Sequence, residues 1–183
     1  MGGRQSFPLG SSPDRLRAVA DDGRPGYERP ASLDEALALL ARLGDRAVPL
    51  AGGTDVALRI RHGLLGPDHM LVDLDRLGLD GLEERGDAVV FGASVRVADI
   101  RSSPLIARRT SLLCEATAEF GSPQIRGRAT LGGNLGNASP VADLAPALVA
   151  LEARVTLRSA SGTRELPVEE LPSGAGKTVR RPE

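Results

Sequence analysis

Strands and helices alternate along residues 27–76, and this order constrains the fold more than any other feature of the sequence. A short strand pattern at 27–30 precedes a helical pattern at 31–45, and apolar runs at 47–51 and 69–76 flank a second helix start. Ser32 and Glu35 have the spacing of a capping box at the start of the first helix, and Gly44 is a natural stop. A β-α-β-α-β order favours a small parallel or mixed sheet.

The second half of the sequence predicts mixed elements without an internal repeat. We expect a strand at 88–94, a short helix at 95–103 and the longest helix of the chain at 104–120, with Pro104 in its first turn. Residues 144–151 fit a buried helix or an extended run. A strand at 152–159 is expected to pair with 162–172 as a hairpin that turns at 159–162.

Composition excludes several classes of protein. The chain has 183 residues, 41% of them hydrophobic, and a formal net charge of −1, so no strong field draws it to nucleic acid or a membrane surface. We expect a cytoplasmic protein, because neither a membrane-spanning run nor a signal-peptide core is seen. Residues 1–24 are rich in glycine, proline and charge, which predicts a disordered tail.

The residues that most often perform catalysis or bind metals are scarce. Cys114 is the single cysteine, which excludes an internal disulfide and a self-contained metal–thiolate cluster, and it fits a buried, inert thiol. His62 and His69 lie near loops without an acidic or thiol partner at ligand spacing, so we interpret them as solvated residues. The sequence therefore predicts no catalytic side chain and no metal site.

Two glycine pairs suggest a site for an anionic ligand. Gly52 and Gly53 stand between a strand and a helix that Thr54 or Asp55 could cap, and Gly132 and Gly133 follow a helix and a short basic linker. Glycine lets a backbone approach a ligand closely, and successive amides can form a nest for phosphate oxygens. The alternative is that each pair is only a tight turn.

Two familiar nucleotide-binding motifs are not supported. Neither glycine pair matches the G-x-G-x-x-G pattern of a Rossmann site. The stretch "SGAGKT" at 173–178 ends like a P-loop, but Leu171 occupies the place of its first glycine and no helix can follow. We therefore reject a P-loop.

Taken together, these stretches resemble the FAD-binding subunit of the molybdenum hydroxylases. That family includes the medium subunit of carbon monoxide dehydrogenase and the flavin domain of xanthine dehydrogenase. The resemblance rests on "YERPASLDEALALLA", "AGGTD", "VVFGASVRVADI", "GSPQIRGRATLGGNLGNASPVADLAPAL" and "GAGKTVRRPE".

The resemblance implies an α+β fold of the vanillyl-alcohol oxidase (PCMH) type, in which FAD lies between two subdomains. We expect these subdomains at 25–80 and 81–183. The second is expected to be incomplete, because family members continue beyond the "GAGKT" segment and add a C-terminal domain.

The resemblance also assigns cofactor-binding residues. The two glycine segments would hold the pyrophosphate, Asn137, Ser139 and Asp143 would face the ribityl chain or phosphates, and Phe120 would lie beside the isoalloxazine ring or end the core of its own helix. Arg126 and Arg128 would offset phosphate charge or remain solvated. The residues assigned within the two glycine segments are Ala51, Gly52, Gly53, Thr54, Asp55, Thr130, Gly132, Gly133 and Asn134.

The function that the resemblance implies is electron relay. In this family a molybdenum-cofactor large subunit oxidises the substrate, a [2Fe-2S] small subunit passes electrons on, and FAD delivers them to NAD, quinone or oxygen. The alternatives are a non-catalytic remnant that only docks with partner subunits, and another flavin reductase of the same fold, such as an enolpyruvyl-sugar reductase.

Overall fold

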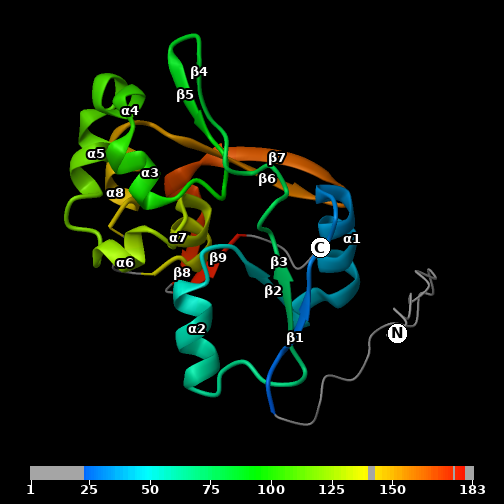
Figure 1. Ribbon diagram of the computed structural model, residues 1–183. Coiled ribbons are helices and arrows are strands. Elements are labelled where there is room, and N and C mark those ends of the chain that lie inside the picture. Colours follow the sequence, from blue (N-terminus) through cyan, green and yellow to red (C-terminus); the bar gives the residue numbers. More distant parts are fainter. Residues whose placement is uncertain (1–22, 140–142, 175, 180–183) are drawn as a thin grey trace, which may run out of the picture.

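The expected β-α-β-α-β order forms a three-stranded parallel sheet (Figure 1). The computed structural model describes residues 23–139, 143–174 and 176–179, so nearly all of the expected disordered tail lies outside the described residues. Strands β1 (Gly26–Glu28), β2 (Ala47–Leu50) and β3 (Met70–Asp73) alternate with helices α1 (Leu33–Leu43) and α2 (Thr54–Arg61), and a short 3₁₀ turn (Gly44–Arg46) follows α1. The strand order is β1-β3-β2, so β1 lies at one edge of this three-stranded sheet.

The capping signals of α1 act nearly as the sequence predicts. The Ser32 hydroxyl accepts a hydrogen bond from the Glu35 amide at 3.1 Å, while the Glu35 carboxylate accepts one from the Ala31 amide at 2.7 Å, one residue earlier than in a standard capping box. Gly44 ends the helix with a φ of 56°. The buried face of α1, which includes Ala36, packs with Val72 of β3 and forms the core on that side of the sheet.

The chain after residue 80 forms strand pairs and short helices around a second core. Among the described residues, its strands form only two-stranded antiparallel pairs. These pairs are β4 (Leu82–Arg85) with β5 (Ala88–Phe91), β6 (Arg154–Ser159) with β7 (Gly162–Pro167), and β8 (Pro172–Gly174) with β9 (Lys177–Thr178). The helices are α3 (Val97–Ser102), α4 (Pro104–Arg109), α5 (Ser111–Ala116), α6 (Pro123–Arg126), α7 (Leu131–Asn137) and α8 (Ala145–Ala150), and a 3₁₀ turn (Val168–Glu170) follows β7.

The predicted long helix at 104–120 is wrong. The structure divides it into α4 and α5, because Thr110 adopts φ −147° and ψ 64°, outside the helical region. The Thr110 amide still closes the last turn of α4 by donating to the Ile106 carbonyl at 2.8 Å. Strand β4 was not predicted from the sequence, whereas the hairpin of β6 and β7, the short helix α3 and the helical choice for 145–150 are confirmed.

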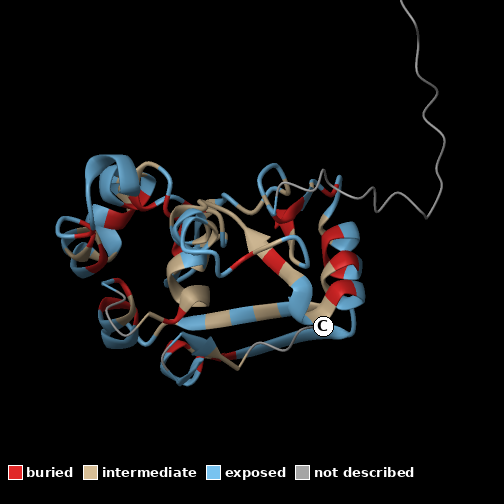
Figure 2. Cartoon of the chain, turned by 90° about the horizontal axis from the view of Figure 1, so that it is seen from below, coloured by how far each residue is buried: buried red, intermediate tan, exposed pale blue. Residues whose placement is uncertain are grey.

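The largest core lies between the helices of this second part. Ile100, Ile106, Leu113 and Leu144 are fully buried there, and strand residues such as Phe91 pack against them. By contrast, the hairpin of β6 and β7 carries little buried surface, as Figure 2 shows. Two-stranded hairpins are marginal without such packing, so this core is the main stabilising unit after residue 80.

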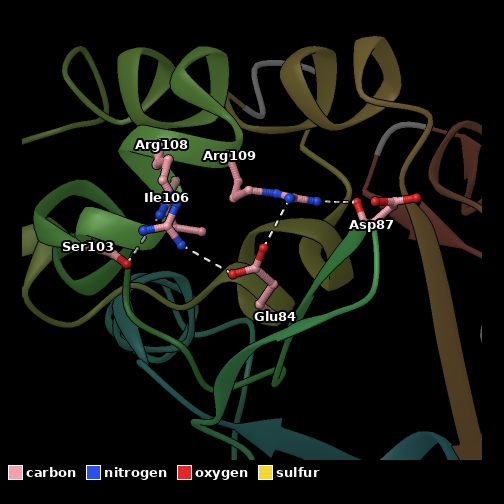
Figure 3. A network of polar contacts seen from close by, with 6 residues as sticks. All are labelled: Glu84, Asp87, Ser103, Ile106, Arg108 and Arg109. Carbon is pink, nitrogen blue, oxygen red and sulfur yellow. Dashed lines mark hydrogen bonds and ion pairs between the residues drawn. The ribbon is translucent and has the colours of Figure 1, made fainter.

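Ion pairs attach the projecting β4–β5 hairpin to α4 (Figures 1 and 3). The Glu84 carboxylate lies 3.0 Å from the Arg109 guanidinium and 3.2 Å from that of Arg108, and Arg109 also donates to the Asp87 carbonyl at 2.8 Å. The partners are partly exposed, so these contacts fix the hairpin's orientation more than they add to stability.

The C-terminal segment is extended where a P-loop would begin a helix. Lys177 and Thr178 form strand β9 instead of beginning a helix, in agreement with the rejection of a P-loop. None of the helices in the described ranges has both the length and the apolar character needed to cross a membrane.

Candidate functional site

The first glycine segment leaves the carboxyl end of β2 and begins helix α2. Gly53 is the N-cap of α2 with a φ of 78°, so the expectation that Thr54 or Asp55 caps the helix is wrong. No side chain caps this helix, and no acceptor among the described residues receives the amides of Gly52, Gly53 or Thr54. Three donors and the positive end of an eight-residue helix are therefore available to an anion.

The second glycine segment forms helix α7 and is neither an open nest nor only a tight turn. Thr130 caps α7 through its hydroxyl, which accepts from the Gly133 amide at 3.1 Å, and its carbonyl accepts from the Asn134 amide at 2.9 Å. The Gly132 amide donates to the Ala93 carbonyl at 2.9 Å. These amides are already used within the chain, so the prediction of an open amide nest is wrong for this segment. The threonine cap and the contacts with 93–97 offset the weak helix propensity of three glycines.

In the part of the chain that the structure describes, two side-chain oxygens in or beside α7 are buried and have no hydrogen-bond partner. They are Oδ1 of Asn134, which the sequence singled out, and Oγ of Ser94, which it did not. Ser94 follows Ala93, whose carbonyl receives the Gly132 amide, and it lies in the quoted "FGAS" stretch. An unsatisfied buried polar atom costs stability, so both oxygens fit a ligand that would supply partners.

The two glycine segments touch one another. A Cβ placed on Gly52 would lie 2.8 Å from the carbonyl carbon of Arg128, closer still to its oxygen, and 3.0 Å from the Cα of Ala129. The segment that leads into α7 therefore packs directly on the turn that leads into α2. The structure thus brings together the two stretches that the sequence could only pair by analogy.

The other predicted site residues have mixed surroundings. Ala51 is half-buried in the first turn, and Asp55 is exposed in the first turn of α2, where its charge favours the helix. Asn137 ends α7 and is half-buried, as is Ser139, while Asp143 is exposed. Pro140, between Ser139 and Asp143, lies outside the described residues.

Phe120 and Arg126 both have well-defined contacts within the chain. Phe120 is 7% exposed and packs in the largest core, which favours a core role over stacking on a ligand. The Arg126 guanidinium donates to the carbonyls of Phe120 at 2.9 Å and Gly121 at 3.0 Å. Arg126 therefore holds the turn before α6, a role that the sequence analysis missed, while the Arg128 side chain is exposed.

A buried carboxylate stabilises the carboxyl end of the parallel sheet, beside the first glycine segment. Asp73 ends β3 opposite Leu50, the residue just before that segment, and accepts hydrogen bonds from the Tyr27 hydroxyl, from Arg29 Nε at 2.8 Å and from the Asp75 amide at 2.9 Å. Burial raises the pKa of the Asp73 carboxyl, but these donors outweigh it and the net pKa is lowered. The hydrogen bond to Asp73 raises the pKa of Tyr27.

The remaining titratable candidates take structural places. The Cys114 thiol is half-buried and donates to the Arg101 carbonyl at 3.4 Å, as an inert residue would. His62 is exposed at the end of α2, whereas His69 Nδ1 accepts from the Gly66 amide at 3.2 Å and so shapes a turn instead of being simply solvated.

These features define a class of protein. Free amides at a helix start, partnerless buried oxygens and a direct contact between two glycine segments fit a domain that binds a phosphate- and hydroxyl-bearing cofactor. Among the described residues of the site, no side chain is arranged as an acid, a base or a nucleophile.

Comparison with known proteins identifies the family. Residues 20–183 match the family model described as the FAD binding domain in molybdopterin dehydrogenase, and the chain belongs to this family. It is 37% identical over 144 residues to the carbon monoxide dehydrogenase medium chain of Hydrogenophaga pseudoflava. The matched region covers 78% of this chain and 50% of the relative. It is 33% identical over 153 residues to the putative xanthine dehydrogenase FAD-binding subunit of Escherichia coli K12, with coverages of 82% and 52%.

Solved structures agree with this assignment. The fold matches carbon monoxide dehydrogenase from H. pseudoflava with a TM-score of 0.83 at 34% identity, covering 87% of this chain and 55% of that one. It matches quinoline 2-oxidoreductase from Pseudomonas putida 86 with a TM-score of 0.80 at 27% identity, covering 86% and 55%. The expected α+β fold of the FAD-binding PCMH type is confirmed, FAD is the cofactor of the family, and the chain spans about half the length of these relatives.

Proposed function

We propose that this chain is the FAD-holding part of a molybdenum hydroxylase and relays electrons from iron–sulfur clusters through FAD to NAD, quinone or oxygen. The names of its relatives, carbon monoxide dehydrogenase medium chain and xanthine dehydrogenase FAD-binding subunit, support this assignment. By the same analogy, its partners are a molybdenum-cofactor large subunit and a [2Fe-2S] small subunit, and it works in the cytoplasm.

The observation that carries the proposal is the convergence of the two glycine segments. The free amides of Gly52, Gly53 and Thr54 would receive the negative charge of the pyrophosphate. The buried Asn134 Oδ1 would accept a hydrogen bond from a cofactor hydroxyl, and its position is fixed by the capped first turn of α7.

The residues after α7 would contact the more polar part of the ligand. Asn137 and Ser139 would offer neutral hydrogen bonds, and Asp143 would accept from ribityl hydroxyls, since a carboxylate repels phosphate. Residues 25–80 and 81–183 would form the two subdomains on either side, and their separate core clusters support this division.

In this assignment the protein positions the cofactor and the cofactor reacts. Bound FAD would supply the electron-accepting and electron-donating chemistry. The chain's own residues would bind and orient it, with no side chain moving a proton, in keeping with the scarcity of histidine and cysteine.

A matched pair of glycine variants tests the site. Gly53 and Gly63 both have left-handed backbones, with φ of 78° and 69°, but Gly53 starts α2 at the proposed site and Gly63 follows its far end. Alanine at either position should cost about 1 kcal/mol of stability. Gly53→Ala should weaken FAD binding at least tenfold in a fluorescence titration, and Gly63→Ala should not; equal affinities would contradict the assignment.

The relay is tested with the reduced flavoprotein. The FAD-loaded chain is reduced without oxygen and mixed with NAD, a quinone or oxygen in a stopped-flow spectrometer. Reoxidation by at least one acceptor is expected. A flavin that no acceptor reoxidises would contradict the relay, and a chain that takes up no FAD would favour the docking remnant.

A further inference from the structure

Gly52 does not leave open space for a ligand, because protein backbone fills the place of its missing side chain. The carbonyl group of Arg128 and the Cα of Ala129 lie where a Cβ would project, at 2.8 Å from the carbonyl carbon and 3.0 Å from the Cα. Real Cβ atoms are not found this close to another backbone, and a backbone cannot rotate away as a long side chain can. The close approach that Gly52 permits is therefore to the protein's own backbone.

The segment that contacts Gly52 is held firmly on its other side. The Ala129 carbonyl accepts from the Val97 amide at 3.0 Å, and the Leu131 amide donates to the Val95 carbonyl at 2.9 Å, around an antiparallel bridge between Arg96 and Thr130. Residues 128–131 therefore lie between Gly52 and the 95–97 strand-like segment. A group added at Gly52 would have to separate these backbones by roughly 1 Å, which a close-packed interior resists.

The contact lies just before the starts of two helices. Gly52 comes one residue before Gly53, the N-cap of α2, and Arg128 comes two residues before Thr130, the N-cap of α7. Any displacement at this contact would change the distance between the starts of both helices. Those starts carry the free amides of the first segment and the buried Asn134 oxygen of the second.

We propose that Gly52 is a positioning residue that sets the spacing of the two cofactor-holding segments by packing backbone against backbone. It acts through residues 128–129 and the helix starts beyond them, in addition to any hydrogen bond from its own amide. This inference rests on the proposed FAD site, which it deepens by giving the two adjacent glycines different tasks.

The test compares Gly52→Ala with Gly81→Ala in the full chain. An alanine at Gly81 would meet open space with an ordinary backbone, so it controls for the loss of a glycine. Hydrogen exchange by NMR reports the Val97 and Leu131 amides, which bond across the contact, and fluorescence titration reports FAD affinity. Gly52→Ala should speed exchange of both amides at least tenfold and weaken FAD binding at least tenfold, while α1 amides and the Gly81→Ala protein stay unchanged.

Several results would overturn the inference and each can be told apart from failure of the FAD site. Unchanged exchange at Val97 and Leu131 in Gly52→Ala, or changed exchange with unaltered FAD affinity, would refute the positioning role while the wild-type site stands. A wild-type chain that takes up no FAD would refute the site itself.

A measurement on the wild-type chain keeps the inference testable if Gly52→Ala does not fold. The geometry predicts a nuclear Overhauser effect between the Hα protons of Gly52 and Ala129 in the free protein. Its absence, with both resonances assigned, would show that the two backbones are not in contact and would overturn the proposal.

Discussion

Replacing the buried carboxylate at the end of β3 by an amide should destabilise the chain in a pH-dependent way. In Asp73→Asn the side chain keeps an oxygen for the Asp75 amide but loses the charge that Arg29 and the Tyr27 hydroxyl contact. Hydrogen bonds to charged groups contribute about 1.5–3 kcal/mol. Arg29 and Tyr27 are each 47% exposed and would regain water, which reduces the loss.

We therefore expect a loss of about 2 kcal/mol at pH 7, or roughly 4–8 °C in the midpoint of thermal unfolding followed by circular dichroism. Asp34→Asn is the matched control. Asp34 pairs with Arg158 at 3.2 Å, but its side chain is 84% exposed, so the same chemical change should cost less than about 0.5 kcal/mol.

The lowered pKa of Asp73 determines how the stability difference between wild type and Asp73→Asn should change with pH. The pKa of Asp73 is lower in the folded chain than its ordinary value of 3.8. The carboxylate's contribution is therefore fully present above that value and is lost as the pH falls through the lowered pKa. The gap between wild type and Asp73→Asn should be constant above about pH 5 and narrow below about pH 4. An equal gap at pH 3 and pH 7, or none at pH 7, would refute the reasoning.

Three further predictions concern other parts of the structure. Thr130→Ala should cost about 1 kcal/mol and weaken FAD binding because α7 loses its cap, whereas Thr130→Ser should restore both, as denaturant unfolding and flavin fluorescence would show. Glu84→Gln should leave global stability within about 1 kcal/mol yet speed amide exchange in the β4–β5 hairpin, because Arg109 loses its charged partner; unchanged exchange would contradict the network. Leu113→Ala should cost about 2–5 kcal/mol in urea unfolding because the side chain is fully buried, whereas Leu64→Ala, at a site 63% exposed, should cost little; similar losses would contradict the assigned core.

Local signals predicted the parallel sheet well. The strand at Gly26–Glu28 and the start and stop of α1 depend on short-range propensities and caps, which a sequence displays directly. The P-loop was rejected for a similar reason, because Leu171 in the place of the first glycine is visible in the sequence itself.

Elements that depend on distant contacts were not predictable in this way. The three glycines of "LGGNLGN" indicate a loop by propensity, but the Thr130 cap and the hydrogen bonds to Val95 and Ala93 make the segment a helix. The break at Thr110 is equally hidden, because the 104–120 stretch reads as one helical pattern. Tertiary contacts override weak local preferences at both places.

The candidate site shows the same division. The glycine pairs are visible in the sequence, but their separate roles are not, since Gly52 faces the backbone of residues 128–129 while Gly53 turns the chain into α2. Ser94 was not predicted as a site residue, because its candidacy depends on the burial of its hydroxyl without a hydrogen-bond partner among the described residues. The glycine segments can be located from residue spacing in the sequence. The atoms that surround each glycine are known only from the folded structure.

The central claim is that the two glycine segments together hold FAD, and the flavin spectrum of the reconstituted chain tests it most directly. The chain is incubated with excess FAD, separated from free cofactor by gel filtration and examined by visible absorption. We predict a flavin band at a stoichiometry near one FAD per chain for the wild-type protein. The same treatment of Gly53→Ala should leave little or no flavin band. A colourless wild-type protein after gel filtration, or full flavin content in Gly53→Ala, would contradict the account.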